Sequence, residues 1–494
     1  MKKIFLISCF VYTLASSSCS DFLDVKPTTS ADAGTAIETA ADAKVVLNGL
    51  MSKLASASYY GRNFPLYADS KGGDLTITSQ GRGYDYLYVF NHSESSNSYS
   101  SIWSQGYHCL AQVNNLIESI EKLKTAGSTE DFDNYLGQAL TVRALIHFDL
   151  VRLYGEPYNE NKSALGVPTV TKLLNGEAQE LRNTVDENYK QIVDDLTSAE
   201  PLLSKAKANG FINFFANKAL QARVYLYMEN YTESLAAAEE VIQADIYTLY
   251  ENSQWAESWS TEFGTESIFE LGVYPNEGDL GNSSLGAMYR KAGHGSSSIL
   301  GYFTASTSFL DKLSEDADDV RWSIMAADEL SETSTHPGKR LGASYKYSGS
   351  TGLAGDKKSA NSTAVNIKVI RLSELYLIAA EAALEKNAPD RQKSANYLNE
   401  IRKRSPNLPA ASAANITMNM IEEERSKELF TEGHRFFDMI RWNKTITFDD
   451  DLGAISTIHR EKSIDRTFYK TILPIPLDEI NANPAIEGQQ NPGY

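Results

Sequence analysis

The stretch that decides the fold runs from residue 220 to residue 242. Its first half reads Leu220-Gln221-Ala222-Arg223-Val224-Tyr225, and its second half carries Tyr231, Leu235, Ala238, Val241 and Ile242. Small and aromatic residues stand where a tetratricopeptide repeat places them. The small residues allow two helices to approach closely, and Tyr225 and Tyr231 fill the gap beyond. The stretch therefore predicts a pair of packed helices.

A weaker copy of this pattern lies between Leu372 and Arg404. Its apolar positions are Leu375, Ala379, Ala380, Ala383, Ala395, Leu398 and Ile401. The spacing between the copies is irregular, which argues against a regular solenoid. We expect a mainly α fold in which about four divergent tetratricopeptide-like helix pairs form a right-handed superhelical scaffold, with a loop-rich ligand-binding lobe.

Other segments carry apolar residues at helical spacing. These segments are 36–54, 102–120, 139–154 and 185–203. The last begins with Thr184 followed three positions later by Glu187, which is the spacing of a capping box. The segment 139–154 is apolar on nearly all faces and ends at Gly155, so it predicts a buried helix.

Composition excludes several classes of protein. The 494 residues include 46 Lys and Arg against 64 Asp and Glu, a formal net charge of −18, and 42% are hydrophobic. The apolar content is sufficient for a sizeable core, whereas the acidic balance argues against a protein that tracks nucleic-acid phosphates. Only Cys9, Cys19 and Cys109 are present, too few for a disulfide scaffold.

The first residues predict export. Lys2 and Lys3 precede an apolar run of about a dozen residues, the pattern of a signal peptide over residues 1–18. The small residues that run into Cys19 resemble a bacterial lipoprotein processing site, so Cys19 is the expected site of lipid attachment by acylation and palmitate-type anchoring. The alternative is a plain secreted protein. Cys109 lies in a helical apolar pattern and is expected to be a buried core thiol.

Glycine and serine mark two regions that interrupt the helical pattern. Residues 61–100 are expected to form a loop region within an N-terminal unit, 19–245. Residues 246–365 are expected to form a loop-rich lobe, and residues 366–494 a C-terminal unit that holds the last helix pair. Loops supported on a rigid scaffold are where binding surfaces usually lie.

The C-terminal part carries a set of distinctive motifs. The longest reads Glu423-Glu424-Arg425-Ser426-Lys427-Glu428-Leu429-Phe430-Thr431-Glu432-Gly433-His434-Arg435-Phe436-Phe437-Asp438-Met439-Ile440-Arg441-Trp442. The others are Ile370–Ala382, Leu398–Arg404, Leu473–Pro476 and Gln490–Tyr494. These motifs resemble the SusD/RagB family of outer-membrane glycan-binding lipoproteins from Bacteroidetes. Earlier segments agree with the same family, namely Cys19–Pro27, Trp103–Ile120, Glu266–Glu270, Asp318–Arg321 and Lys346–Tyr347.

This resemblance implies a function that periodicity does not. It implies a lipid-anchored, non-catalytic protein on the outer face of the outer membrane, which holds a glycan over a SusC-like TonB-dependent transporter. Asp21 and Asp24 resemble the family's surface-export signal. The alternatives are a tetratricopeptide-type surface protein that binds peptide or protein cargo and, less favoured, a surface glycosidase. No pair of carboxylates marks a hydrolytic site.

Sugar sites combine exposed aromatic rings with polar side chains at the rim. The segment 74–88 has this composition, with Asp74, Arg82, Tyr84, Tyr86 and Tyr88 as candidates. If it is extended, the three alternating tyrosines share one face; the structural alternative is a half-buried strand. Tyr289 and Tyr302 form a second candidate patch, with packing of a loop as the alternative.

The remaining chemistry-bearing residues have plain structural interpretations. Trp103, Trp322 and Trp442 are expected to be structural, whereas Trp255 and Trp259 stay undecided between core and sugar platform. Glu432, His434 and Asp438 lie within two predicted helical turns, and His434 and Asp438 have the i, i+4 spacing of a metal pair. No third ligand stands at a recognised spacing, so these residues are expected to form salt bridges rather than a metal site. The acidic runs 316–319 and 449–451 lack the pattern of a calcium loop and are expected to be solvated, with calcium as the alternative. No other cofactor is expected.

Overall fold

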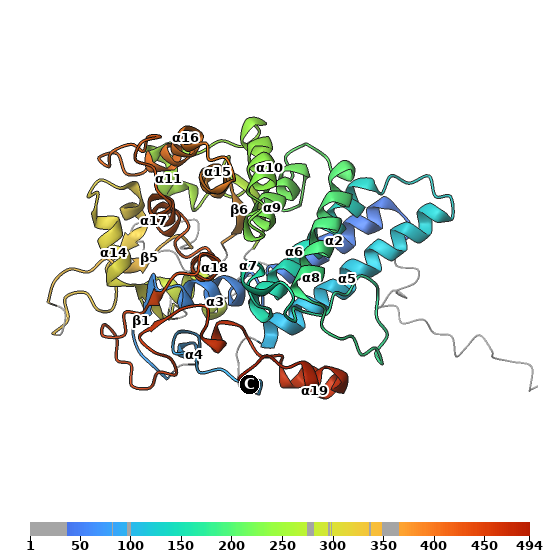
Figure 1. The fold of residues 1–494 in the computed structure, drawn as a ribbon, viewed down its shortest axis with the longest axis horizontal. Helices are drawn as coiled ribbons and strands as arrows, with labels where there is room; N and C mark the ends of the chain where they lie inside the picture. Colours follow the sequence, from blue (N-terminus) through green and yellow to red (C-terminus); the bar gives the residue numbers. More distant parts are fainter. Residues whose placement is uncertain are drawn as a thin grey trace, which may run out of the picture.

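The computed structural model describes residues 37–81, 83–95, 100–273, 281–294, 297, 299–334, 337–347 and 365–494. The signal peptide, Cys19 and Arg82 lie outside these residues. The described chain is mainly helical, as the periodicity predicts (Figure 1). Its longer helices are α2 (Ala40–Leu54), α3 (Asn63–Lys71), α5 (Ser100–Thr125), α6 (Asp133–Tyr154), α8 (Val185–Ala199), α9 (Phe214–Tyr227), α10 (Tyr231–Gln243), α14 (Thr307–Ser314), α15 (Leu372–Glu385), α16 (Arg391–Arg402) and α17 (Met418–Glu428). Shorter helices are α4 (Asp85–Tyr88), α7 (Tyr158–Asn161), α11 (Asn252–Ser258), α13 (Leu285–Tyr289), α18 (Arg435–Arg441) and α19 (Leu477–Ala482).

The long helices form a continuous row. α2 packs on α5, α5 on α6, α6 on α8 and α9 on α10. The row continues through α10 on α15 and α15 on α16, so two helix pairs that are far apart in sequence lie side by side (Figure 1). The helix pairs expected for residues 220–242 and 372–404 are therefore confirmed.

Local sequence signals begin and end these helices as expected. Thr184 and Glu187 form the predicted capping box at the start of α8, and Thr39 with Asp42 forms another at α2. α6 ends at Gly155, as the sequence predicts. Within the α9/α10 pair the Ser234 hydroxyl donates to the Ala222 carbonyl at 2.8 Å, a close approach that small side chains permit.

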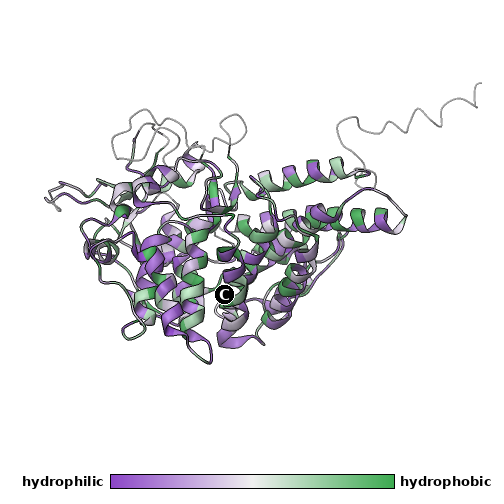
Figure 2. Cartoon of the chain, turned by 90° about the horizontal axis from the view of Figure 1, so that it is seen from above, coloured by the Kyte–Doolittle hydropathy of each residue, from purple (hydrophilic) through white to green (hydrophobic). Residues whose placement is uncertain are grey.

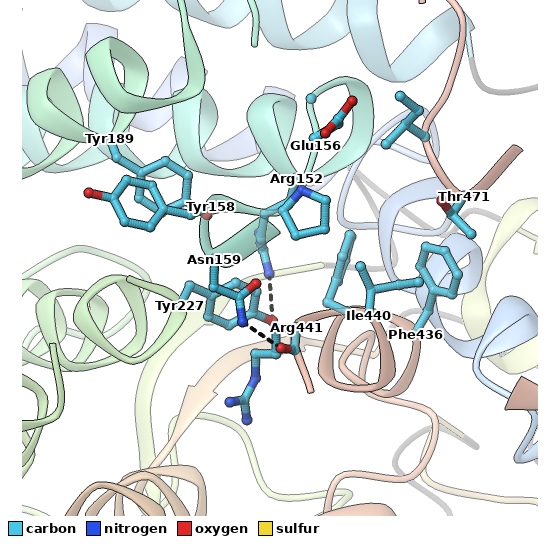
Figure 3. A pocket seen from close by; sticks show the side chains of 14 residues that line it. Arg152, Glu156, Tyr158, Asn159, Tyr189, Tyr227, Phe436, Ile440, Arg441 and Thr471 are labelled. Atoms are coloured by element: carbon cyan, nitrogen blue, oxygen red, sulfur yellow. Dashed lines mark hydrogen bonds between the residues drawn. The ribbon is translucent and has the colours of Figure 1, made fainter. Parts of the chain in front are cut away.

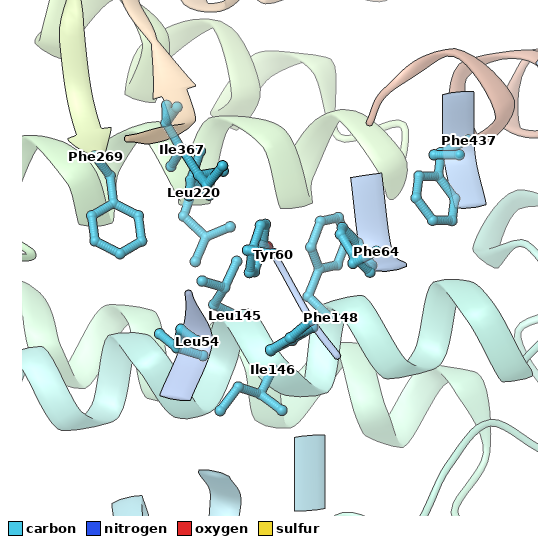
Figure 4. Packing of buried hydrophobic residues seen from close by; sticks show 14 of the residues in the cluster. Leu54, Tyr60, Phe64, Leu145, Ile146, Phe148, Leu220, Phe269, Ile367 and Phe437 are labelled. Carbon is cyan, nitrogen blue, oxygen red and sulfur yellow. The ribbon is translucent and has the colours of Figure 1, made fainter. Parts of the chain in front are cut away.

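The core is shared by the scaffold and the more irregular part of the chain. Side chains from α2, α6, α9, β2 (Ser267–Leu271), β6 (Ile367–Arg371) and α18 meet in one cluster (Figure 4). Hydrophilic and hydrophobic residues alternate along the helices, as expected for amphipathic segments (Figure 2). One hydrophobic cluster thus joins the helices α2, α6 and α9 to β2, β6 and α18.

The strands pair as short antiparallel two-stranded ladders. These are β1 (Leu75–Ile77) with β3 (Phe303–Ala305), β2 with β6, β4 (Met325–Ala326) with β5 (Ala343–Ser344), and β7 (Ile446–Thr447) with β8 (Ser463–Ile464). In the first ladder Leu75 lies opposite Ala305, so it joins the 61–100 region to the 246–365 region.

The expectation that residues 61–100 form a loop region was wrong for much of its length. The described part contains α3, β1 and α4. α3 is buried along its whole length and packs against α18, which a glycine-rich composition does not reveal. In the part of the chain that the structure describes, every helix is too short or too polar to cross a membrane.

Candidate ligand-binding site

The three tyrosines predicted to share the face of an extended segment lie instead around one helical turn. Tyr84 precedes α4, and Tyr86 and Tyr88 lie within it. Because a helix turns by about 100° per residue, alternate residues point in different directions. The extended geometry was therefore wrong, and the tyrosines do not form a common platform.

Tyr88 points into the protein and is fully buried. Its ring packs edge-on against Phe448 and faces the Arg460 guanidinium, whose centre lies 4.9 Å from the ring centroid. Its hydroxyl lies 3.3 Å from the Thr76 hydroxyl. In this conformation Tyr88 offers no ring face to a sugar and supports the segment that carries Tyr86.

Tyr302 and Tyr289 are also buried, each only 1% exposed. The Tyr302 hydroxyl donates to Asp85 Oδ1 at 3.1 Å, and the Tyr289 hydroxyl donates to Asp69 Oδ2 at 2.9 Å. Both rings thus follow the alternative interpretation, in which aromatic residues pack a loop down.

Asp74 lies in an ionic cluster rather than at a rim. It is 4% exposed, and its carboxylate accepts from Lys312 Nζ and the Ser426 hydroxyl, each at 2.7 Å. Arg435 Nε lies 3.1 Å away. Burial by itself would raise the pKa of Asp74, but Arg435 and Lys312 outweigh it and hold the pKa below its usual value. The carboxylate is fully engaged by protein groups.

Two of the predicted tyrosines keep accessible surface. Tyr86 is 36% exposed and Tyr84 is half-buried. Arg62 Nη1 donates to the Tyr84 hydroxyl at 3.0 Å, and its guanidinium centre lies 5.2 Å from the Tyr84 ring centroid. Arg62, Tyr84 and Tyr86 are named here the Tyr84 patch. In this patch the Tyr84 ring meets a polar side chain at the surface and a second exposed ring lies two residues further on, the combination of groups that a sugar site requires.

The sequence signal for Arg62 was weak, and the prediction missed it. Arg62 lies just before α3, outside any periodic pattern, and meets Tyr84 only because the chain folds back after β1. Arg82, which the sequence proposed for the same site, lies outside the described residues. A polar residue beside a Gly-rich, aromatic segment was the only available signal.

The undecided tryptophans belong to the core. Trp255 is fully buried and Trp259 is 2% exposed, with their rings edge-to-face. Trp103 is 2% exposed, which confirms its structural role. The indoles of Trp322 and Trp442 donate to Asp316 O and Glu381 Oε1. Cys109 is fully buried, and burial raises the pKa of its thiol to about 12, as expected for an inert core cysteine.

The residues tested as a metal set are partners in salt bridges. Glu432 binds Lys346 and Arg371, whereas Asp438 binds Arg425 and Arg441. His434 Nδ1 lies 3.9 Å from Glu374, and burial lowers the pKa of its imidazole to about 4. The salt-bridge interpretation is thereby confirmed. Among the described residues no group of three His, Cys, Asp or Glu side chains is arranged around a metal position.

The acidic runs are less solvated than expected. Asp316 and Asp319 are each 3% exposed; Asp316 accepts from the Asn407 amides, and Asp319 pairs with Arg321 at 2.6 Å. Asp450 pairs with Arg460 at 2.8 Å, whereas Asp318 and Asp451 are exposed, as expected. The expected solvated face was wrong for Asp316 and Asp319, because these carboxylates meet the Asn407 amides and the Arg321 guanidinium.

A separate hollow lies where α6, α7, α8, α9 and α18 meet (Figure 3). Its volume is about 30 Å³, and its aromatic walls are formed by Tyr158, Tyr189, Tyr227, Phe436 and Phe437. Asn159 Nδ2 donates to the Arg441 carbonyl at 2.7 Å across its edge (Figure 3). A larger and more polar hollow of about 400 Å³ adjoins it. Of the residues that the sequence predicts for a sugar site, those that the structure describes line neither hollow.

Comparisons with known proteins identify the family of this chain. The model of the SusD family matches residues 78–494. SusD-like protein P38 of Formosa agariphila is 24% identical over 533 aligned positions, which cover 97% of this chain and 99% of that protein. A SusD superfamily structure from Bacteroides thetaiotaomicron superposes with a TM-score of 0.83 at 32% identity, covering 92% of this chain and all of the other. A Bacteroides vulgatus structure whose name refers to sugar binding gives a TM-score of 0.80 at 32% identity, covering 93% and 100%. The chain belongs to the SusD family.

Proposed function

We propose that this protein binds a glycan at the cell surface and passes it to a SusC-like TonB-dependent transporter, without changing it chemically. The Tyr84 patch is the observation that carries this proposal. Flat C–H faces of a sugar pack on aromatic rings, while its hydroxyls bond to polar neighbours.

Contacts with neighbouring residues hold the Tyr84 patch in position. Arg62 orients the Tyr84 ring through its hydroxyl, and the Tyr302 ring packs edge-on against Tyr84 with centroids 5.7 Å apart. The Asp85 carboxylate accepts from the backbone amides of Gly81 and Gly83 and from Tyr302, which fixes the start of α4. Such support lowers the entropy lost when a ligand binds.

The name of the Bacteroides vulgatus relative gives the glycan part of the proposal independent support. Catalysis is not part of the proposal, because no pair of carboxylates in the sequence marks a hydrolytic site, and the acidic residues weighed there for metal binding, such as Asp319, Glu432 and Asp438, are engaged by arginine donors. A glycosidase acid or base needs access to the glycosidic bond.

Anchoring through an acylated Cys19 completes the proposal. A lipid anchor would keep the binding surface near the membrane that holds the transporter. A Cys19→Ala variant expressed in a Bacteroidetes host should move from the membrane fraction to the soluble fraction. Co-purification of the SusC-like transporter with the wild type, and its loss when the receptor is released from the membrane, is the expected result for the partner.

Affinity electrophoresis through gels that contain single polysaccharides tests the glycan part. We expect at least one polysaccharide to retard the wild type and a Tyr84→Ala/Tyr86→Ala variant to migrate freely. Lys190→Ala, a change at an exposed pair far along the chain, serves as the matched surface control. Retardation that is unchanged in the double variant would reject the site, and release of reducing sugar would reject the non-catalytic proposal.

A further inference from the structure

Arg62 differs from most arginines of the described chain in having no anionic partner. Its Nε donates to Asn63 Oδ1 at 2.8 Å and its Nη1 to the Tyr84 hydroxyl at 3.0 Å. Both acceptors are neutral, and Nη2 has no acceptor among the described residues. Two of the five N–H groups are thereby used, and no carboxylate of the described residues pairs with the positive charge.

The contrast with the other arginines is clear. Arg143, Arg223, Arg321, Arg371, Arg441 and Arg460 each pair with a carboxylate. Arg182, which lacks one, donates to four backbone carbonyls. Arg62 has neither kind of partner within the part of the chain that the structure describes.

The carboxylate next to Tyr84 does not compensate this charge. Asp85 is 2% exposed and accepts from Gly81 N, Gly83 N and the Tyr302 hydroxyl, so it is directed into the protein. Partial burial lowers the pKa of the Arg62 guanidinium, and the only charged form that opposes this shift is that of Tyr84. Removing a charge from water without a counter-charge is unfavourable, and a bound anion would offset that loss.

We propose that Arg62 makes the Tyr84 patch selective for glycan units that carry an anionic group, a carboxylate or a sulfate. This inference rests on the proposed function and names the ligand class for the same site. The sugar unit that packs on Tyr84 places its anionic group beside Arg62, which donates hydrogen bonds to it, while Tyr86 contacts a neighbouring unit. A guanidinium suits planar, two-oxygen acceptors, since its N–H groups form a rigid fork. The local charge opposes the net charge of −18, which by itself would repel such a polymer.

Matched ligand pairs test the charge requirement. Polygalacturonate oligosaccharides are compared by calorimetry with their methyl-esterified forms, and sulfated galactan oligosaccharides with the desulfated forms. We expect the wild type to bind the anionic member of at least one pair about tenfold more tightly or better, the scale of a hydrogen bond to a charged group. The pair that shows the difference identifies the anion as carboxylate or sulfate.

Variants of Arg62 test whether this side chain causes the preference for anionic ligands. Arg62→Gln should remove the preference, Arg62→Lys should keep part of it, and Arg391→Gln, an arginine that donates to backbone carbonyls elsewhere, should leave it unchanged. If Arg62→Gln does not fold, the salt dependence of the wild type replaces it: the preference should fall as ionic strength rises. Equal binding of both members of each pair would overturn this inference and leave the proposed function standing. A preference that survives in folded Arg62→Gln would also overturn it, whereas binding of no polysaccharide at all would reject the proposed function itself.

Discussion

The helix pairs and the segment around α17 pack by different means. In the α9/α10 pair, Ala222 and Ala238 are fully buried and the helices meet through small side chains. At the end of β6 the contacts are ionic: Arg371 binds Glu266 before β2 at 2.6 Å, Glu432 after α17 at 2.7 Å, and Glu428 at the end of α17 at 3.1 Å. Arg321 and Lys346 add pairs to Glu424 and Glu432. We call the residues Glu266, Arg321, Lys346, Arg371, Glu424, Glu428 and Glu432 the ionic seam.

This difference in packing indicates a structural role for the family motifs. Every member of the ionic seam lies in a motif that carried the resemblance, and the side chains that pair there are at most 5% exposed. A buried charge tolerates few replacements, because each one must keep its partners. The motifs therefore specify how the irregular part docks on the helix pairs, whereas the Tyr84 patch lies apart from the seam.

The largest effect is expected from breaking the ionic seam. Arg371→Met leaves the carboxylates of Glu266, Glu428 and Glu432 buried with too little positive charge. We expect the free energy of unfolding in urea to fall by about 3–5 kcal/mol, the usual result of removing one partner of a buried ion pair. Lys190→Met, at an exposed pair with Asp194, should change it by about 0.5 kcal/mol or less. Equal losses in the two variants would contradict the distinction between seam and surface.

A smaller effect is expected from overpacking the helix pairs. Ala238→Leu adds three carbons at a fully buried position of α10, and we expect a loss of about 1–3 kcal/mol in the free energy of unfolding. Ala236→Leu adds the same volume on the exposed side of the same helix and should be nearly neutral. Thermal unfolding of both variants measures the difference; a stable Ala238→Leu would show that close helix contact is not required.

The sequence predicted the helix pairs better than it predicted the site. Stripes such as 185–203 repeat at the helical period, and the capping box at Thr184 marks where one begins, so local signals suffice. The orientation of Tyr84, Tyr86 and Tyr88 depends instead on whether five residues are extended or helical, and on Phe448 and Arg460 from a distant segment. Composition suggested the right segment, but burial of Tyr88, Tyr289 and Tyr302 is a tertiary property that one sequence does not reveal.

A third prediction concerns a lysine that is buried among aromatic rings and has no carboxylate partner in the ionic seam. Lys71 is fully buried; its Nζ lies 4.0 Å from the Phe90 ring centroid and 4.4 Å from that of Tyr67. Burial, with help from Lys470 and Arg460, lowers its pKa well below the ordinary value. The unfolded chain therefore binds a proton that the folded chain lacks in the window between the lowered pKa and about 10.4, and wild-type stability should rise with pH there.

Lys71→Met should remove this dependence. In the window the difference in unfolding free energy between variant and wild type should shrink with rising pH by up to about 1.4 kcal/mol per pH unit. Urea titrations at several pH values between neutrality and pH 10 measure it. A difference that stays constant across the window would mean that Lys71 keeps its charge through contact with the aromatic rings.

The smallest effect on stability is expected at the Tyr84 patch, and it carries the functional information. Tyr86→Ala removes a ring that is 36% exposed, so we expect the free energy of unfolding to change by about 0.5 kcal/mol. Tyr88→Ala, two residues on, empties a fully buried position and should lower it by about 3–5 kcal/mol. If Tyr86 contacts sugar, polysaccharide retention is lost in Tyr86→Ala although the stability of this variant is nearly unchanged. If instead Tyr86→Ala keeps polysaccharide retention and Tyr88→Ala loses it, the ligand contacts another surface, and the Tyr84 patch, like the ionic seam, is purely structural.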